Sequence, residues 1–306
     1  MYFLLHLIFG VVFFVLVGWF FWGGAYFISA LMFVFIYLFI STLIFLLLRR
    51  SFFRDVKIHR DDQHELKMAQ RVHQSFLMFD PPPQDKVTLA AKCIPASTVG
   101  GDFYAVVNNI SPILSKQEQQ PGVLSYLESE QSYMGFVIGD VAGHGVSSAL
   151  VMALSSGLFS RLGLNNYDPA QIMTKANHDI YQYIQNSQIS YVTSFYVTVD
   201  FQQNRLLYSG AGHPSALLIR GQSIIELETQ NIFLGMYPDE TFSQKTVSLE
   251  PGDRVFFYTD GITEVENHLK KQYGVDRLAG HLVDQRDLGV DEMLAFLFDD
   301  VHRFSQ

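Results

Sequence analysis

The chain has 306 residues, 49% of them hydrophobic, with a formal net charge of −9 and a single cysteine. This length allows one large domain together with a smaller segment. Nucleic-acid binding needs clustered Lys and Arg, so the acidic balance excludes it as the expected function, and Cys93 alone excludes an intrachain disulfide. The composition therefore predicts a protein of a reducing compartment with no nucleic-acid partner.

The first 48 residues form a continuous apolar segment. Residues 1–48 contain no Lys, Arg, Asp or Glu, and they are rich in Phe, Leu, Val and Ile. A membrane span needs about 20 apolar residues, so the segment has the length of two transmembrane helices, with the break near 22–25. Basic residues follow at once in 49–57, and by the positive-inside rule they place the rest of the chain in the cytoplasm. The sequence predicts a two-pass hairpin in the inner (cytoplasmic) membrane.

Residues 49–80 are charged and helix-prone, and we expect a helical connector there. Four of its residues recur with a heptad-like 3-4-3 spacing, which predicts a short seam for homodimerisation. These residues are Leu66, Ala69, His73 and Phe76. The prolines at 81–83 end the helical pattern and mark the boundary to a domain over 81–306.

The remaining chain alternates between groups of strands and pairs of helices. Polar loop 108–132 is expected to join two hairpin strands, and Asp168 is expected to cap a helix that begins at Pro169. The other expected helices are 147–162, 276–285 and 291–304, and the expected strands are 87–94, 103–107, 134–139, 191–200, 205–209, 215–220, 224–227, 244–249 and 254–259. This order predicts an α+β fold. Cys93, in the first strand, has no adjacent cation and is predicted to be a core thiol, not a nucleophile.

Three acidic residues stand beside glycine at the ends of strand-like segments. They are Asp102, Asp140 and Asp260. Each places hard carboxylate oxygens, which Mg²⁺ and Mn²⁺ prefer, beside backbone that can approach a ligand closely. One such turn alone is equally consistent with an Asp that caps the following helix. Three of them together predict carboxylates that converge on a metal pair.

A pair of divalent ions would allow hydrolysis of a phosphate ester without a protein nucleophile. Water bridging such ions loses a proton near neutral pH and can attack phosphorus in line. The sequence agrees with this chemistry, because it has no Gly-x-Ser-x-Gly elbow, no Walker loop and no cysteine beside a base.

An ordered set of motifs over about residues 66–304 resembles the bacterial SpoIIE-like branch of the metal-dependent PPM, or protein phosphatase 2C-like, phosphatases. The motifs are Ala69-Gln-Arg-Val-His-Gln74, Pro95-Ala-Ser-Thr-Val-Gly-Gly-Asp-Phe-Tyr104, Gly139-Asp-Val-Ala-Gly-His-Gly145, Ala211-Gly-His-Pro214, Leu234-Gly235 and Tyr258-Thr-Asp-Gly-Ile-Thr-Glu264. The resemblance implies an α-β-β-α sandwich of two mainly antiparallel sheets and two Mn²⁺ or Mg²⁺ ions. It also implies hydrolysis of phosphoserine or phosphothreonine on a regulatory protein, often an anti-sigma-factor antagonist.

The resemblance also implies roles for individual residues. Asp140 would bridge both ions, and the Val141 carbonyl would be a backbone ligand. Asp102 would complete the shell of one ion and Asp260 that of the other. His144 would donate a proton to the leaving serine oxygen.

Two departures from the family pattern support an alternative function. Ala105 replaces a second acid, and Asp299-Asp300 lie inside a helical pattern, so we expect the domain to lack the family's terminal Asp-bearing strand. The alternative is a catalytically weak signalling module that binds a partner protein. The three intact aspartates favour a membrane-tethered phosphatase, in which the connector passes a signal to the metal site.

Overall fold

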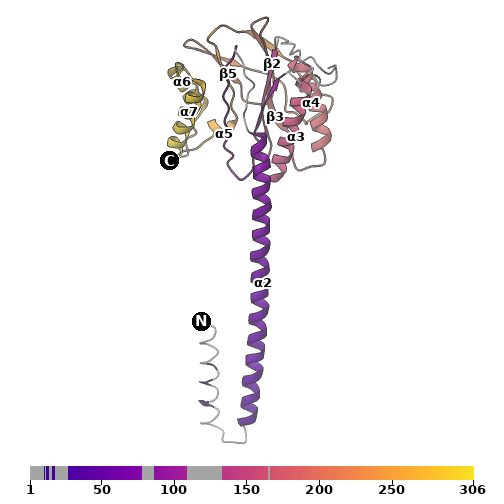
Figure 1. The fold of residues 1–306 in the computed structure, drawn as a ribbon, viewed down its shortest axis with the longest axis vertical. Helices are drawn as coiled ribbons and strands as arrows, with labels where there is room; N and C mark the ends of the chain where they lie inside the picture. The colour runs from indigo at the N-terminus through magenta and orange to yellow at the C-terminus, as the bar shows by residue number, and fades with distance from the viewer. Residues whose placement is uncertain are drawn as a thin grey trace, which may run out of the picture. The chain divides into compact units, whose positions relative to one another are not determined.

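The structure is a computed structural model, and it describes residues 10, 12–13, 16–17, 27–77, 86–108, 133–164 and 166–306 (Figure 1). The chain divides into two compact units, Met1–Lys67 and Met68–Gln306. Most of the predicted first span and its break near 22–25 lie outside the described residues. The same holds for the proline boundary at 81–83 and for nearly all of the loop 108–132.

One long helix, α2 (Phe27–Phe76), contains the predicted second span and most of the predicted connector. The sequence divided this region at residue 49, whereas the helix continues without a break across that position. Within α2 the segment Val34–Leu47 is apolar, and many of its large side chains, such as Phe35 and Phe39, are exposed.

Where the structure describes the chain, one helix has the length and apolar composition of a membrane span, namely α3 (Val146–Gly163). Met152 and Phe159 of this helix are fully buried in the unit Met68–Gln306, and α3 packs on strands β1 and β2. Its apolar character is therefore explained by core packing.

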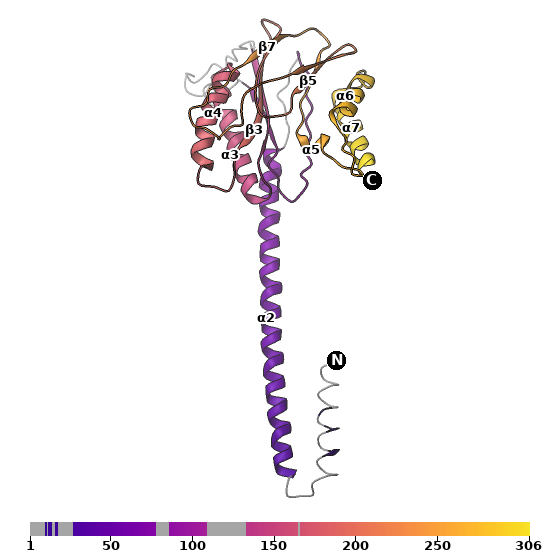
Figure 2. The same cartoon turned by 180° about the vertical axis from the view of Figure 1, so that it is seen from behind.

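The second unit consists of two antiparallel sheets between two pairs of helices, as Figures 1 and 2 show. The first sheet has the order β1-β2-β3-β4-β7 and the second β6-β5-β8. The strands are β1 (Phe103–Asn108), β2 (Tyr133–Val141), β3 (Val192–Asp200), β4 (Arg205–Ala211), β5 (Ala216–Arg220), β6 (Ser223–Leu227), β7 (Lys245–Ser248) and β8 (Arg254–Phe256). The helices are α3, α4 (Pro169–Ile184), the short α5 (Asp260–Thr263), α6 (Val275–Asp284) and α7 (Val290–Ser305). The predicted α+β sandwich is confirmed.

Three separate hydrophobic clusters hold these four layers together. Alternation along β3 directs Tyr196 toward α3, where it stacks on Phe159, and directs Phe195 into the cluster between the sheets. In the same way Leu218 of β5 faces the other sheet, whereas Leu217 belongs to the cluster with α6 and α7. The central strands are thus buried on both faces, and this makes the sheet ends a rigid support for a site.

Some of the helix and strand boundaries predicted from sequence agree with the structure, and others do not. Asp168 caps α4 as predicted, because its Oδ1 accepts the Gln171 N–H at 3.0 Å. The predicted strand 87–94 is wrong, since these residues have no regular secondary structure and join neither sheet in the described part of the chain. The predicted strand 254–259 ends at Phe256, and the chain then turns toward α5.

Candidate metal centre

Asp140 is the next to last residue of β2, not part of a turn after it. It pairs with Thr193 on β3, and the Thr193 hydroxyl donates to the Asp140 carbonyl at 3.4 Å. The same hydroxyl lies 2.9 Å from Nδ1 of the buried His213, the residue before Pro214. The Asp140 backbone is thus fixed by the centre of the sheet.

Asp102 is brought beside Asp140 by a close backbone contact at Gly101. The Val141 N–H donates to the Gly101 carbonyl at 3.3 Å. A Cβ atom on Gly101 would lie 2.7 Å from the Val141 carbonyl oxygen and 2.8 Å from Asp140 Oδ1. Only glycine permits this approach, so the turn before Asp102 and the end of β2 form one cradle.

Asp260 joins the other two carboxylates through its neighbour Thr259. Asp260 begins α5, and the Thr259 side chain forms a hydrogen bond with Asp102. Asp102, Asp140 and Asp260 come from three distant parts of the sequence, and their carboxylates lie near enough to repel one another.

The three carboxylates repel one another, and this repulsion changes their pKa values. Burial, followed by repulsion from Asp102 and Asp260, raises the pKa of Asp140 to about 7. Burial also raises the pKa of Asp102; repulsion from Asp260 adds to this effect, while the Thr259 hydrogen bond opposes it. Carboxylates that repel one another in a half-buried site are stabilised by a cation.

The donor atoms fit hard divalent cations. Among the residues that the structure describes, no three His, Cys, Asp or Glu side chains form a preassembled cluster. A site for Mg²⁺ or Mn²⁺ does not need one, because Mg²⁺ keeps several waters and is usually held by one or two protein carboxylates. The cradle at Gly101 adds the Val141 carbonyl oxygen, so the site offers carboxylate and backbone oxygens together.

His144 lies in the turn between β2 and α3, with Gly143 at φ 101° and Gly145 at φ 82° on either side. Its side chain is exposed, and within the described part of the chain it has no hydrogen bond or ion pair. The turn places it four residues after Asp140. Its role as a proton donor stays a prediction.

Cys93 lies near the centre without the properties of a nucleophile. Burial, followed by the negative charges of Asp102 and Asp140, raises the pKa of its thiol to about 12. Such a thiol is neutral at physiological pH and reacts poorly. The prediction of an inert thiol agrees with this, although the segment around it is not a strand.

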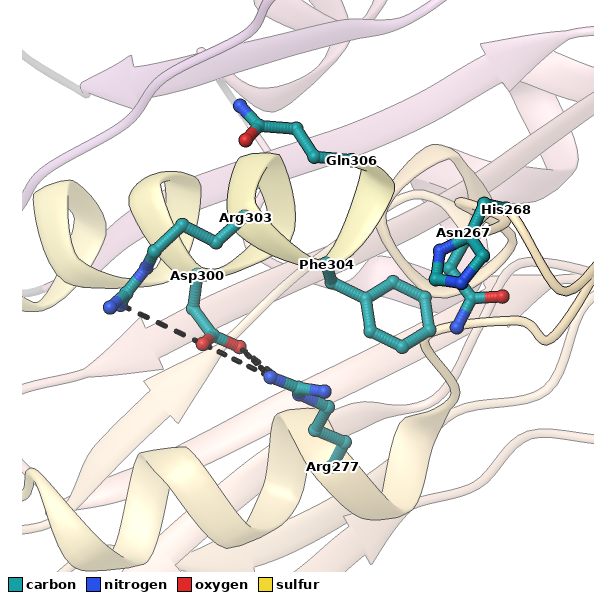
Figure 3. Close-up of a pocket in the computed structure, with 7 residues that line it drawn as sticks. All are labelled: Asn267, His268, Arg277, Asp300, Arg303, Phe304 and Gln306. Atoms are coloured by element: carbon teal, nitrogen blue, oxygen red, sulfur yellow. Dashed lines mark hydrogen bonds and ion pairs between the residues drawn. The ribbon is translucent and has the colours of Figure 1, made fainter.

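The pair Asp299-Asp300 is helical, as the sequence indicated, and Asp300 serves a structural network on α7. Asp300 accepts a hydrogen bond from the hydroxyl of Tyr273, which precedes α6, at 2.9 Å. It also accepts one from Arg277 of α6 at 3.1 Å, and this bond connects α6 to α7 (Figure 3). Burial would raise the pKa of Asp300, but the hydrogen bond from Tyr273 and the charge of Arg277 outweigh it and lower that pKa. The Asp300 carboxylate is therefore occupied by hydrogen bonds and ion pairs with side chains of its own domain.

A cavity of about 430 Å³ lies beside this network (Figure 3). It is lined by Asn267, His268, Arg277, Asp300, Arg303, Phe304 and Gln306. None of the three converging aspartates lines it, so it is separate from the candidate metal centre.

Sequence reasoning missed two residues that contact the centre. Thr259 was part of a quoted motif but received no role. His73 was assigned to a dimerisation seam, and this assignment is wrong, because its side chain is 4% exposed and contacts Gly100 inside its own domain. A histidine at a predicted seam position, where an apolar residue is expected, was the signal for a different role.

The raised pKa of Asp140 predicts how pH affects the protein without metal. Its pKa in the folded state, about 7, lies above the ordinary value of 3.8. Between these values the folded state binds more protons than the unfolded state, so stability should fall as pH rises from about 4 to 7. We expect the melting temperature in EDTA to fall over this range, relative to Asp140→Asn measured alongside. If the difference in melting temperature between the two proteins stays the same from about pH 4 to pH 7, the prediction is contradicted.

Comparisons with known proteins identify the family of this chain. A family model described as Stage II sporulation protein E (SpoIIE) matches residues 130–306. Phosphoserine phosphatase RsbU of Bacillus subtilis (strain 168) is 23% identical over 209 residues, which are 68% of this chain and 56% of that protein. Phosphoserine phosphatase RsbP of the same organism is 26% identical over 205 residues, 66% of this chain and 46% of that protein. The chain therefore spans about half the length of these relatives.

Solved structures share the fold. The SiaA-PP2C domain of Pseudomonas aeruginosa aligns with a TM-score of 0.61 at 18% identity, covering 81% of this chain and 92% of that one. The RsbU and RsbW domains of Rv1364c from Mycobacterium tuberculosis align with a TM-score of 0.51 at 21% identity, covering 69% and 52%. Since the family model covers more than half of the residues, the chain belongs to the SpoIIE family and has a PP2C-like fold.

Proposed function

We propose that this protein is a metal-dependent phosphatase that hydrolyses phosphoserine or phosphothreonine on a regulatory protein. The observation that supports the proposal is the mutual repulsion of Asp102, Asp140 and Asp260 beside the close contact of Gly101 with Asp140 and Val141, in a chain with a PP2C-like fold. The names of the relatives RsbU and RsbP, both phosphoserine phosphatases, support it. An anti-sigma-factor antagonist is the substrate class that we propose.

Each residue of the candidate metal centre would have a separate role in the proposed hydrolysis. Asp140 would bridge two Mn²⁺ or Mg²⁺ ions with the Val141 carbonyl as a further ligand, while Asp102 would hold one ion and Asp260 the other. When bound, such ions supply a water of lowered pKa and neutralise charge on the phosphoryl group. Thr259 orients the Asp102 carboxylate, and His144, exposed in the turn after β2, would give a proton to the leaving serine oxygen.

We place the enzyme at the inner membrane with its catalytic domain in the cytoplasm. This proposal is supported by the uncharged residues 1–48, by the basic residues that follow them, and by the exposed apolar side chains of Val34–Leu47. Contiguous exposed apolar surface of this kind is unfavourable in water and suits lipid.

A homodimer through the end of α2 is also part of the proposal. With His73 buried in its own domain, the exposed apolar residues in this part of α2 are Leu66, Met68, Val72 and Phe76. The spacing of four residues places Met68, Val72 and Phe76 along one face of the helix, where a second copy would pack.

A weak or inactive module that binds a partner is the second candidate. Ala105 favours it, because this half-buried position of β1 holds no acid to support the centre. The two candidates differ in turnover, and so a single assay separates them.

The experiment is hydrolysis of p-nitrophenyl phosphate and of phosphoserine and phosphothreonine peptides by the full chain in detergent. We expect turnover with Mn²⁺, its loss in EDTA, and its return when Mn²⁺ is added in excess, since the proposed nucleophile depends on the ions. A folded sample that binds Mn²⁺ but hydrolyses none of these substrates would reject catalysis and favour the binding module.

A further inference from the structure

The last turn of α2 contacts the segment that carries Asp102 at two points. Nε2 of His73 lies 3.1 Å from both the carbonyl oxygen and the amide nitrogen of Gly100. One helical turn later, the carbonyl of Leu77 accepts a hydrogen bond from the Tyr104 hydroxyl. The two contacted residues lie two positions before and two positions after Asp102, so the helix end holds this carboxylate's segment from both sides.

The imidazole of His73 is an unusual choice for a packing residue. It is 4% exposed, and its Nδ1 has no hydrogen-bond partner among the residues that the structure describes. A buried polar atom without a hydrogen-bond partner is unfavourable, so a leucine would pack at this position at lower cost. The imidazole, unlike a leucine side chain, can form a hydrogen bond with the Gly100 backbone.

The same segment is in direct contact with the candidate metal centre. Gly101, next to Gly100, lies against the Val141 carbonyl and the Asp140 carboxylate, and Asp102 is hydrogen-bonded to Thr259. Ligands of a metal site must be held within about 0.5 Å of the productive geometry. A shift of the 100–104 backbone would therefore move Asp102 relative to Asp140.

We propose that His73 is a positioning residue for the metal centre: with the Leu77 carbonyl, it clamps Gly100–Tyr104 so that Asp102 faces Asp140 and Asp260. This inference rests on the proposed metal-dependent function, and it adds a residue outside the ligand set. His73 touches neither substrate nor ion in this role. It acts through the backbone of Gly100.

Substitutions at residue 73 separate clamping from packing. Leucine fills the space but forms no hydrogen bond. The glutamine amide carries both an NH2 donor group and a carbonyl acceptor, so it can bind the Gly100 carbonyl and N–H together, whereas a single imidazole nitrogen binds one of them in each tautomer. Gln74→Leu is the matched control, because Gln74 is the exposed neighbour on the same turn.

The measurement is Mn²⁺ binding by the full chain in detergent, followed through the loss of the electron paramagnetic resonance signal of free Mn²⁺. We expect His73→Leu to weaken affinity by about tenfold, as loss of a residue that orients a ligand does in other metal sites. His73→Gln and Gln74→Leu should bind Mn²⁺ like the unmodified protein. In the hydrolysis assay His73→Leu should need more Mn²⁺ for half-maximal rate, with kcat recovered at saturation.

Tyr104→Phe tests the second contact and removes only one hydroxyl, so it keeps the test decisive if His73→Leu fails to fold. Its Mn²⁺ affinity should fall by a smaller factor than that of His73→Leu. Folded His73→Leu with unchanged affinity would overturn the proposal. An equal loss of Mn²⁺ affinity in His73→Gln would also overturn the proposal, because the shape of the side chain and not its hydrogen bonding would then determine the affinity.

The outcomes also distinguish this inference from the phosphatase proposal. Weaker Mn²⁺ binding in His73→Leu, with no hydrolysis by any variant, would reject the phosphatase and leave the clamp standing. Hydrolysis by the unmodified protein, with equal Mn²⁺ affinity in all variants, would reject the clamp alone. Absence of Mn²⁺ binding to the unmodified protein would overturn both.

Discussion

Asp140→Asn should abolish Mn²⁺-dependent phosphatase activity and at the same time stabilise the metal-free protein. The amide is neutral and cannot bridge two cations, so we expect turnover to fall at least about 10³-fold, the equivalent of about 4 kcal/mol of transition-state stabilisation. Stability should change in the opposite direction. Burial and the charges of Asp102 and Asp260 disfavour ionised Asp140, and the substitution removes that repulsion.

The test combines hydrolysis of a phosphoserine peptide with thermal melting in EDTA at pH 8. A rise in melting temperature of about 2–4 °C would correspond to about 1 kcal/mol in a domain of this size. Asp299→Asn is the matched control, because Asp299 is an exposed aspartate on α7 that is not one of the three carboxylates, and it should change neither quantity. Retained turnover in Asp140→Asn would remove the basis for the proposed metal centre. Loss of turnover together with lower stability would indicate a structural role.

The features predicted best from sequence depend on neighbours in the chain. The Asp168 cap with Pro169, and the helical pattern through Asp300, follow from local spacing, and the structure contains both. The β-branched and aromatic residues of β3 likewise predict a strand, and both of its faces are buried against different layers. These features need no knowledge of the fold.

The features that were missed depend on contacts between distant segments. The segment 87–94 has the composition of a strand but joins neither sheet among the described residues, and composition does not reveal whether a partner exists. His73 fitted a heptad spacing, although its contact with Gly100 is 27 residues away in the sequence. The hydrogen bond from Thr259 to Asp102 is also non-local. The three aspartates were found because carboxylates are recognisable as metal ligands, whereas His73 and Thr259 lie in the same motifs but their contacts with distant segments cannot be predicted from residue type.

Gly101→Ala should disable the metal centre through a single methyl group. The added Cβ would lie 2.7 Å from the Val141 carbonyl oxygen and 2.8 Å from Asp140 Oδ1, and carbon atoms do not approach oxygen so closely without a shift. The Val141 carbonyl belongs to the sheet and cannot yield, so the turn that carries Asp102 must move. Displacement of about 1 Å in a site of this kind can reduce activity by about 10²-fold.

The neighbouring Gly100 provides the control for this prediction. A Cβ on Gly100 would meet only Pro95 Cβ, at an ordinary distance of 3.6 Å, so Gly100→Ala should bind Mn²⁺ and hydrolyse phosphopeptide almost as the unmodified protein does. Neither glycine has a positive φ, and alanine is therefore compatible with the backbone at both positions. The two variants thus differ in whether the added methyl group meets Asp140 and Val141, and not in chain flexibility. Equal Mn²⁺ affinity and turnover in both would show that the contact of Gly101 with Asp140 and Val141 does not position the site.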